Sequence, residues 1–171
     1  MDKEQYSNYK DKEQEELEKA RKITVDTVNP NEQQPEVDHN IQMKQSQSGY
    51  LNLVHSGWRD CRGDGFFSYD MKVDPEQYMY LLVTYFGSDA TLHVDGKSYQ
   101  RDFDILIDGE VIASQQLHAN KPGALFDVCY EIPAHLMINK EKVEVRFKSE
   151  EGKAAGGVYG VRILNERATF H

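Results

Sequence analysis

The sequence predicts an all-β fold, an antiparallel β-sandwich of jelly-roll type with a short N-terminal helix. Short runs with period-two alternation recur along residues 66–164, and turn signals separate them about every ten residues. Two Asp-Gly steps, at 95–96 and 108–109, have the composition of two-residue hairpin turns between antiparallel strands. We therefore divide the chain into a linker helix over residues 1–23 and a β-sandwich accessory domain over residues 24–171.

The first segment is helical in composition. DKEQEELEKARKI (11–23) carries glutamate–lysine pairs at the favourable i,i+4 spacing. Its apolar face consists only of Leu17, Ala20 and Ile23, and a helix this short and polar is marginal by itself. It is either a solvated linker helix or a helix that binds a partner, and the dense charge pattern favours the linker.

Residues 24–48 contain two prolines and many amides with little helical periodicity. This predicts an extended connector that leads into a first strand near residues 39–44. In FFSYDMKV (66–73), alternate residues then occupy opposite faces of a half-buried strand. YMYLLVTYF (78–86) is apolar on both faces and therefore predicts a strand covered on both sides, either by the N-terminal helix or by an absent neighbouring domain.

The remaining strands follow the same alternation. LFDVCYEI (125–132) and VEVRF (143–147) place apolar residues on one face, which leaves Cys129 on the solvent side. IPAHLMINK (132–140) predicts a single helical turn after its proline. AAGGVYGVRIL (154–164) predicts a last strand whose glycines mark a bulge or a close backbone approach.

Composition excludes several classes of protein. The formal net charge of -9 and the isoelectric point near 5.1 argue against a continuous phosphate-binding surface, so we expect no nucleic-acid partner. The sequence contains no run of eighteen apolar residues, so we expect no membrane span. The opening MDKEQ is typical of an excised fragment without a secretion signal. Cys61 and Cys129 form no CxxC pair, so their redox state stays open.

No metal or cofactor site is predicted. The histidines show no i,i+4 pair with a carboxylate at ligand spacing; they are His39, His55, His93, His118, His135 and His171. The acidic stretch DCRGDG (60–65) lacks the alternating oxygen ligands and the closing glutamate of a calcium loop. A structural calcium with ligands from separate strands stays open, because such a site leaves no sequence signature.

We also predict that the chain is not an enzyme. It contains no GxSxG motif and no cysteine in a recognisable activating setting. Asp60, Asp64, Asp102 and Asp104 are the candidates for a hydrolytic carboxylate pair, but Asp102 and Asp104 share the solvent side of their strand. Solvated carboxylates keep ordinary pKa values and are poor acids at neutral pH.

The aromatic residues are the remaining candidates for a functional site. The stretch GWRDCRGDGFFSYDMKV (57–73) contains the only tryptophan of the chain. Sugars are held by aromatic faces together with a few convergent polar groups, so Trp58, Arg59, Asp60 and Tyr85 are the candidate carbohydrate-binding residues. The competing interpretation is that Trp58 covers the core and that Arg59 forms an ion pair with a nearby aspartate that fixes a loop.

Several motifs together carry a family resemblance. WRD followed by GFFSYD, then TYFGSD, FDILIDG and AGGVYGVR resemble, in this order, the C-terminal accessory domain of bacterial β-L-arabinofuranosidase-type glycoside hydrolases, of family 146 and its relatives in family 127. The resemblance covers nearly all of the chain from residue 24 onward. One departure is Phe86, where a tryptophan is common in the family.

The resemblance implies a non-catalytic, carbohydrate-binding-like accessory domain of a hydrolase that acts on arabinose-containing plant glycans. The implied partners are the catalytic domain of the parent hydrolase and an arabinose-containing oligosaccharide, and the implied location of the parent is the periplasm or the cell surface. Nothing in the chain matches the cysteine nucleophile and zinc ligands of the family's catalytic barrel. The alternative function is a purely structural domain that packs against that barrel or supports a dimer without binding sugar.

Overall fold

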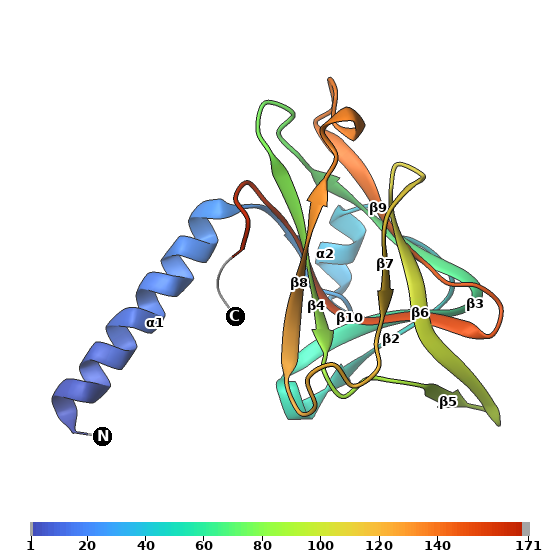
Figure 1. Ribbon diagram of the computed structural model, residues 1–171, viewed down its shortest axis with the longest axis horizontal. Coiled ribbons are helices and arrows are strands. Elements are labelled where there is room, and N and C mark those ends of the chain that lie inside the picture. Colours follow the sequence, from blue (N-terminus) through green and yellow to red (C-terminus); the bar gives the residue numbers. More distant parts are fainter. Residues whose placement is uncertain (1, 169–171) are drawn as a thin grey trace.

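The computed structural model describes residues 2–168, and the predicted all-β sandwich is confirmed (Figure 1). His171 lies outside the described residues. The elements in chain order are α1 (Lys3–Ile23), β1 (Thr24–Val28), α2 (Gln33–Asp38), β2 (Gln42–Leu51), η1 (Asn52–Val54), β3 (Ser56–Lys72), β4 (Met79–Phe86), β5 (Leu92–Val94), β6 (Lys97–Ile107), β7 (Glu110–Gln116), β8 (Leu125–Ile132), η2 (Ala134–Leu136), β9 (Lys142–Lys148) and β10 (Lys153–Leu164).

The strands form two layers that β10 joins. In one layer the order is β2, β3, β9, β6 and β7, with all neighbours antiparallel. In the other layer β1, β10, β4 and β8 are paired in that order, also antiparallel. The second half of β10 pairs with β4, whereas Ala154 and Ala155 in its first half pair with β3, and Ala154 also pairs with β6 in parallel. One continuous strand therefore connects the two sheets at one end of the sandwich.

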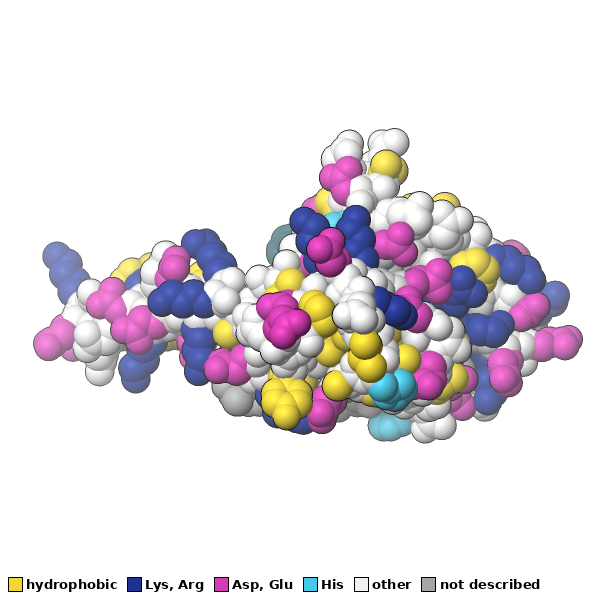
Figure 2. Space-filling model, turned by 90° about the horizontal axis from the view of Figure 1, so that it is seen from above, with side chains coloured by type: hydrophobic (Ala, Val, Ile, Leu, Met, Phe, Trp, Pro, Cys, Tyr) yellow, Lys and Arg dark blue, Asp and Glu magenta, His cyan; other side chains and the backbone are white. Residues whose placement is uncertain are grey.

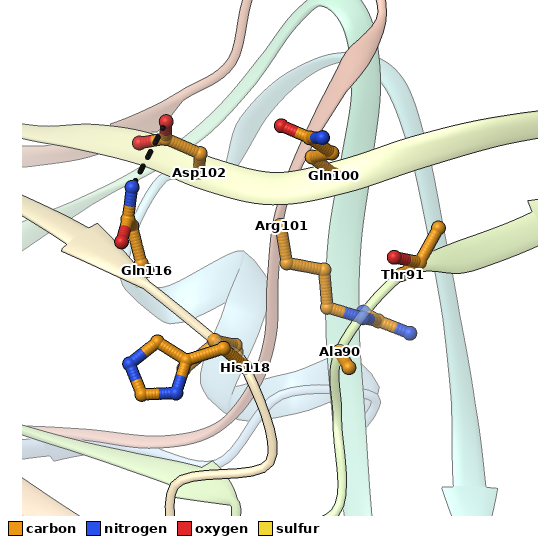
Figure 3. Close-up of a pocket in the computed structure, with 8 residues that line it drawn as sticks. Ala90, Thr91, Gln100, Arg101, Asp102, Gln116 and His118 are labelled. Atoms are coloured by element: carbon orange, nitrogen blue, oxygen red, sulfur yellow. Dashed lines mark hydrogen bonds between the residues drawn. The ribbon is translucent and has the colours of Figure 1, made fainter.

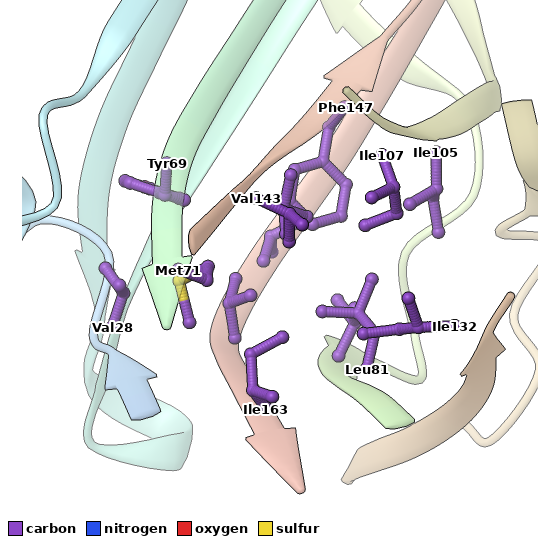
Figure 4. Packing of buried hydrophobic residues seen from close by; sticks show 14 of the residues in the cluster. Val28, Tyr69, Met71, Leu81, Ile105, Ile107, Ile132, Val143, Phe147 and Ile163 are labelled. Carbon is purple, nitrogen blue, oxygen red and sulfur yellow. The ribbon is translucent and has the colours of Figure 1, made fainter. Parts of the chain in front are cut away.

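Apolar side chains from both layers meet in one core (Figure 4). Phe67, Tyr69 and Met71 occupy alternate positions of β3 and are fully buried, as the period-two pattern predicted. Phe67 stacks on Phe147 of β9 with ring centroids 5.0 Å apart. Leu81 of β4 faces this group from the opposite layer (Figure 4). Because burial of apolar surface is the main favourable contribution to folding, this alternation holds the sandwich together.

The outer face of β4 is covered by residues of the chain itself. Leu82 is 2% exposed and packs against Ile23 at the end of α1 and Leu164 at the end of β10. Phe86 lies against Tyr159, with ring centroids 6.1 Å apart. Of the two predicted covers, the N-terminal helix contributes through Ile23 at its end, and residues of the last strand pack beside it.

The N-terminal helix fills the segment that the sequence assigned to a linker helix, residues 1–23, and extends well beyond the charge-paired stretch 11–23. It begins at Lys3, where Asp2 and Gln5 form a reciprocal capping box. Ile23 is its only buried residue, and the helix projects away from the sandwich at the left of Figure 1. Figure 2 shows basic and acidic side chains interspersed along it and over the visible face of the sandwich, which is the pattern of a solvated surface.

The expectation of an extended connector over residues 24–48 is wrong in part. This segment forms β1, then the short helix α2, and β2 begins at Gln42. Pro35 stands in the first turn of α2, where the missing N–H of proline costs no helical hydrogen bond. Residues 56–62, to which the sequence analysis assigned no element, form the first part of β3.

Both predicted hairpins are confirmed. The Asp95-Gly96 step joins β5 to β6, and Asp108-Gly109 joins β6 to β7. All four residues have positive φ angles, between 48° and 86°, as a hairpin turn of the I′ type requires. The predicted helical turn after Pro133 is also present, as η2.

A buried ion pair ties α2 to the sheet. Arg59 donates from Nε and Nη2 to the two carboxylate oxygens of Glu36, at 2.7 and 3.0 Å. The Tyr69 hydroxyl donates to the same carboxylate at 2.6 Å, and Arg59 Nη1 donates to the Ser46 hydroxyl at 2.9 Å. Burial acts to lower the pKa of Arg59, but the hydrogen bond and charge of Glu36 hold this pKa above its ordinary value. The pair anchors a helix that sequence periodicity did not predict.

Substituting Glu36→Gln is expected to lower the free energy of unfolding by about 3 to 5 kcal/mol, because it leaves the Arg59 charge buried without a counter-charge. Urea unfolding of the full chain measures this change. The matched control is Glu131→Gln, which removes an exposed pair with Arg167 and is expected to cost less than about 1 kcal/mol. Equal losses in the two variants would contradict a structural role for the buried pair.

Candidate functional site

A pocket with aromatic and charged walls lies at the end of the sandwich where β10 crosses between the layers. We call it the Trp58 pocket, and its volume is about 230 Å³. Its lining residues come from β2, β3, β4, the loop before β5, β5, β6 and β10: Leu51, Trp58, Asp60, Arg62, Phe86, Asp89, Leu92, Arg101, Gly157 and Tyr159.

The alternation of β3 divides its residues between two environments. Trp58, Asp60 and Arg62 are at alternate positions and line the pocket. The intervening Arg59 and Cys61 point to the other side, where Arg59 meets Glu36 and Cys61 joins the core. Because successive side chains of a strand point to opposite faces, a single stretch supplies both the pocket wall and the anchor of α2.

The charged groups of the pocket are only loosely paired with one another. Arg62 Nη2 lies 3.7 Å from an oxygen of Asp60, and Arg101 Nη2 lies 3.8 Å from an oxygen of Asp89. Both distances exceed those of a hydrogen bond. Arg101 is held in place instead by donation from Nη1 to the backbone oxygen of Gly156, at 2.9 Å.

Three buried side-chain atoms in this cluster have no hydrogen-bond partner among the described residues. They are Oδ1 of Asp60 and the Nε atoms of Arg62 and Arg101, and no other such atom is found in residues 2–168. All three residues line the Trp58 pocket. Unpaired buried polar groups are costly in folded proteins, and their concentration at a single site is typical of a functional site.

Burial dominates the titration of the acidic groups. It raises the pKa of Asp60 above the ordinary value of 3.8, although Arg62 and Arg101 oppose the shift. It also raises the pKa of Asp89, against the effect of Arg101. The pKa of the Tyr159 hydroxyl is raised by burial and by the Asp89 charge, so this hydroxyl stays protonated.

Two glycines determine the shape of the pocket. A Cβ on Gly49 would lie 2.6 Å from Cζ2 of Trp58, so the indole can lie against β2 only because this position has no side chain. A Cβ on Gly157 would lie 3.3 Å from the Tyr159 ring and 3.5 Å from an oxygen of Asp89. Gly157 therefore leaves open the space between the aromatic and acidic walls.

The structure separates the four residues that the sequence suggested as a carbohydrate platform. Trp58, which is half-buried, and Asp60 line the pocket together. Arg59 does not, because it is buried in its ion pair, and the partner is Glu36 of α2 rather than an aspartate. Tyr85 does not either: it is fully buried in the core, where its hydroxyl lies 2.9 Å from that of Tyr130. These placements correct the expected positions of Arg59 and Tyr85.

Sequence reasoning missed most of the other lining residues. Arg62 had a usable signal, since it continues the alternation of Trp58 and Asp60 on β3. Asp89, Arg101 and Tyr159 come from segments far apart in the chain, and no spacing in the sequence predicts that they line the same pocket. From the sequence, Phe86 is only a position where the family that the chain resembles commonly has tryptophan. In the structure, Phe86 lines the pocket.

No group of three or more His, Cys, Asp or Glu residues in the described part of the chain is placed to hold a metal ion. Burial raises the pKa of Cys61 to about 11, so its thiol is protonated at neutral pH. Both cysteines are free, and Cys129 is half-buried rather than on the open surface.

Neither helix of the described chain is long and apolar enough to cross a membrane.

Solved structures of carbohydrate-active proteins share this fold. A family 35 carbohydrate-binding module from an environmental isolate is similar with a TM-score of 0.54 and 8% identity, over 86% of this chain and 100% of the module. A family 35 module from Clostridium thermocellum is similar with a TM-score of 0.52 and 10% identity, over 83% and 100% of the two chains.

An exo-β-1,3-galactanase from Phanerochaete chrysosporium, in a structure with β-1,3-galactotriose, is similar with a TM-score of 0.54 and 10% identity. The match covers 81% of this chain but only 29% of the galactanase. At these identities the similarities establish the fold alone. The molecule is thus a β-sandwich of the kind found in carbohydrate-binding modules and in domains of glycoside hydrolases.

The chain belongs to the family of unknown function DUF6805, whose model matches residues 19–164. The match begins near the end of α1 and continues to the last residue of β10, so it includes the whole Trp58 pocket. No curated protein matches the sequence.

Substituting Gly49→Ala is expected to displace the Trp58 indole, because the new methyl group would overlap the ring. Since Trp58 is the only tryptophan, a change in the intrinsic emission spectrum of the folded protein reports this movement. Tyr50→Ala, an exposed change at the next position of β2, is the control and is expected to leave the spectrum unchanged. An unaltered spectrum in Gly49→Ala would contradict the close packing described here.

Asp60→Asn is expected to reveal the raised pKa of Asp60 through the pH dependence of stability. Above the raised pKa, the buried carboxylate destabilises the folded wild type, and this effect disappears as the pH falls toward the ordinary value of 3.8. The thermal midpoint of the wild type should therefore rise relative to that of Asp60→Asn on acidification from neutral pH. A relative fall over the same range would show that the pKa is lowered instead.

Proposed function

We propose that the Trp58 pocket binds a neutral sugar and that the protein is a non-catalytic carbohydrate-binding domain. The observation that carries the proposal is the convergence of three unpaired buried polar atoms, on Asp60, Arg62 and Arg101, beside aromatic side chains in one pocket. A ligand suited to this site would donate a hydrogen bond to the Asp60 carboxylate and accept hydrogen bonds from the guanidinium groups of Arg62 and Arg101, while presenting an apolar surface.

Sugars meet this requirement. Each hydroxyl group both donates and accepts, so neighbouring hydroxyls of one ring can satisfy a carboxylate and a guanidinium together. The C–H face of the ring packs on aromatic surfaces such as those of Trp58 and Tyr159. The mixture of apolar walls and a few placed polar groups is also the general pattern of small-molecule sites.

Charge and size favour a single neutral unit. Two aspartates and two arginines line the pocket, so its formal charges balance and it offers no net attraction to an ionic ligand. Its volume of about 230 Å³ is below the range of about 300 to 1,000 Å³ typical of drug-sized ligands. We infer that the pocket holds one sugar residue.

We further propose that the sugar belongs to an arabinose-containing plant glycan and that the domain serves a glycoside hydrolase. The support is the order of the motifs WRD, GFFSYD, FDILIDG and AGGVYGVR in the sequence, together with the fold shared with carbohydrate-binding modules. Within such a hydrolase, α1 would connect the sandwich to the catalytic domain. Tethering of even a weak site raises the local concentration of substrate without any new chemistry.

Titration of the full chain with L-arabinose, arabinotriose, galactose and β-1,3-galactotriose tests this function. Binding is expected to change the emission of Trp58 and to be detectable by calorimetry. Arg62→Met is expected to weaken the affinity by about tenfold or more, because a hydrogen bond to a charged group contributes about 1.5 to 3 kcal/mol. Trp58→Ala is also expected to weaken it, because it removes the aromatic surface on which the sugar ring packs.

The matched control is Tyr85→Phe, which removes only a hydroxyl that is buried in the core and is expected to leave sugar affinity unchanged. Thermal unfolding of each variant shows that it is folded. Failure of all four sugars to bind at millimolar concentration would contradict the proposal. Binding of galactose but not of arabinose would retain the sugar site and reject the arabinose assignment.

A further inference from the structure

We propose that a second pocket beside the Trp58 pocket is a subsite for the next residue of a glycan chain, so that the domain prefers oligosaccharides to single sugars. The inference rests on the proposed function of the Trp58 pocket. The second pocket has a volume of about 240 Å³ and is lined by Ala90, Thr91, Gln100, Arg101, Asp102, Gln116, Leu117 and His118.

The two pockets adjoin. Arg101 lines both of them. The segment before and into β5 also serves both, since Asp89 and Leu92 face the Trp58 pocket whereas Ala90 and Thr91 face the second pocket. Figure 3 shows the Arg101 side chain extending from β6 toward Ala90 and Thr91. A ligand that leaves the Trp58 pocket over this segment therefore enters the second pocket directly.

The second pocket presents the polar groups that bind hydroxyls. Thr91, Gln100 and His118 are exposed, and their side chains make no hydrogen bond to any other residue between 2 and 168. The side chain of Gln116 makes one long hydrogen bond, in which its Nε2 donates to an oxygen of Asp102 at 3.5 Å (Figure 3). Leu117, which is 3% exposed, contributes an apolar surface beneath them.

The second pocket differs in composition from the Trp58 pocket, and this difference indicates which of the two pockets selects the sugar. The second pocket has no large aromatic residue and no buried side-chain atom without a partner apart from Nε of the shared Arg101. Hydroxyl, amide and imidazole groups are hydrogen-bonding partners that sugar hydroxyls can use. The Trp58 pocket therefore selects the sugar, and the second pocket adds affinity only when a further residue is attached.

Paired titrations of a monosaccharide and its trisaccharide test the subsite. We expect the wild type to bind arabinotriose about tenfold more tightly than L-arabinose, or β-1,3-galactotriose more tightly than galactose by the same factor. The double variant Gln116→Ala/His118→Ala is expected to lose this difference while its affinity for the monosaccharide stays unchanged.

His135→Ala is the matched control. His135 is an exposed histidine in η2, the turn that follows β8, and it lines neither pocket, so its loss is expected to leave both affinities unchanged. A wild type that binds monosaccharide and trisaccharide equally well, or a double variant that keeps the difference, would overturn the subsite and leave the proposed sugar pocket standing. Absence of binding by every sugar would overturn both.

Discussion

The period-two alternation of strand β3 is the constraint on which the rest of the structure depends. It sends Arg59 to one side, where Glu36 neutralises its charge, and sends Trp58 and Asp60 to the other, where they form a pocket wall. A shift of one residue in the pairing of this strand would exchange the two sets and place an unpaired guanidinium in the pocket. The buried ion pair with α2 therefore helps to specify the register that builds the site.

The two sides of β3 also differ in how well their polar groups are satisfied. On the α2 side, the carboxylate of Glu36 accepts hydrogen bonds from Arg59, Tyr69 and the backbone of Asn31. On the pocket side, Asp60 keeps an oxygen with no partner among the described residues. The extensive core and the satisfied network on the α2 side stabilise the fold, and this stability offsets the cost of the unpaired polar groups on the pocket side.

Strand β10 explains why the pocket stands at one end of the sandwich. Its first half pairs with β3 and its second half with β4, so the layers converge where Gly157 and Tyr159 pass between them. At this crossing, side chains from both sheets and from the loop before β5 line one pocket. The same fold occurs in carbohydrate-binding modules and in a galactanase, but fold similarity near 10% identity does not transfer a ligand or a site. The support for a function therefore has to come from the residues of the Trp58 pocket.

The sequence by itself determined the fold class, the two Asp-Gly hairpins and the buried face of residues 67–71. These features depend on local alternation and turn chemistry, which neighbouring residues express directly. Only the tertiary structure decided that Arg101 and Tyr159 converge on the Trp58 pocket, that Tyr85 is buried in the core, and that Arg59 pairs with Glu36. Those outcomes depend on contacts between segments far apart in the chain, and no local pattern encodes such distances.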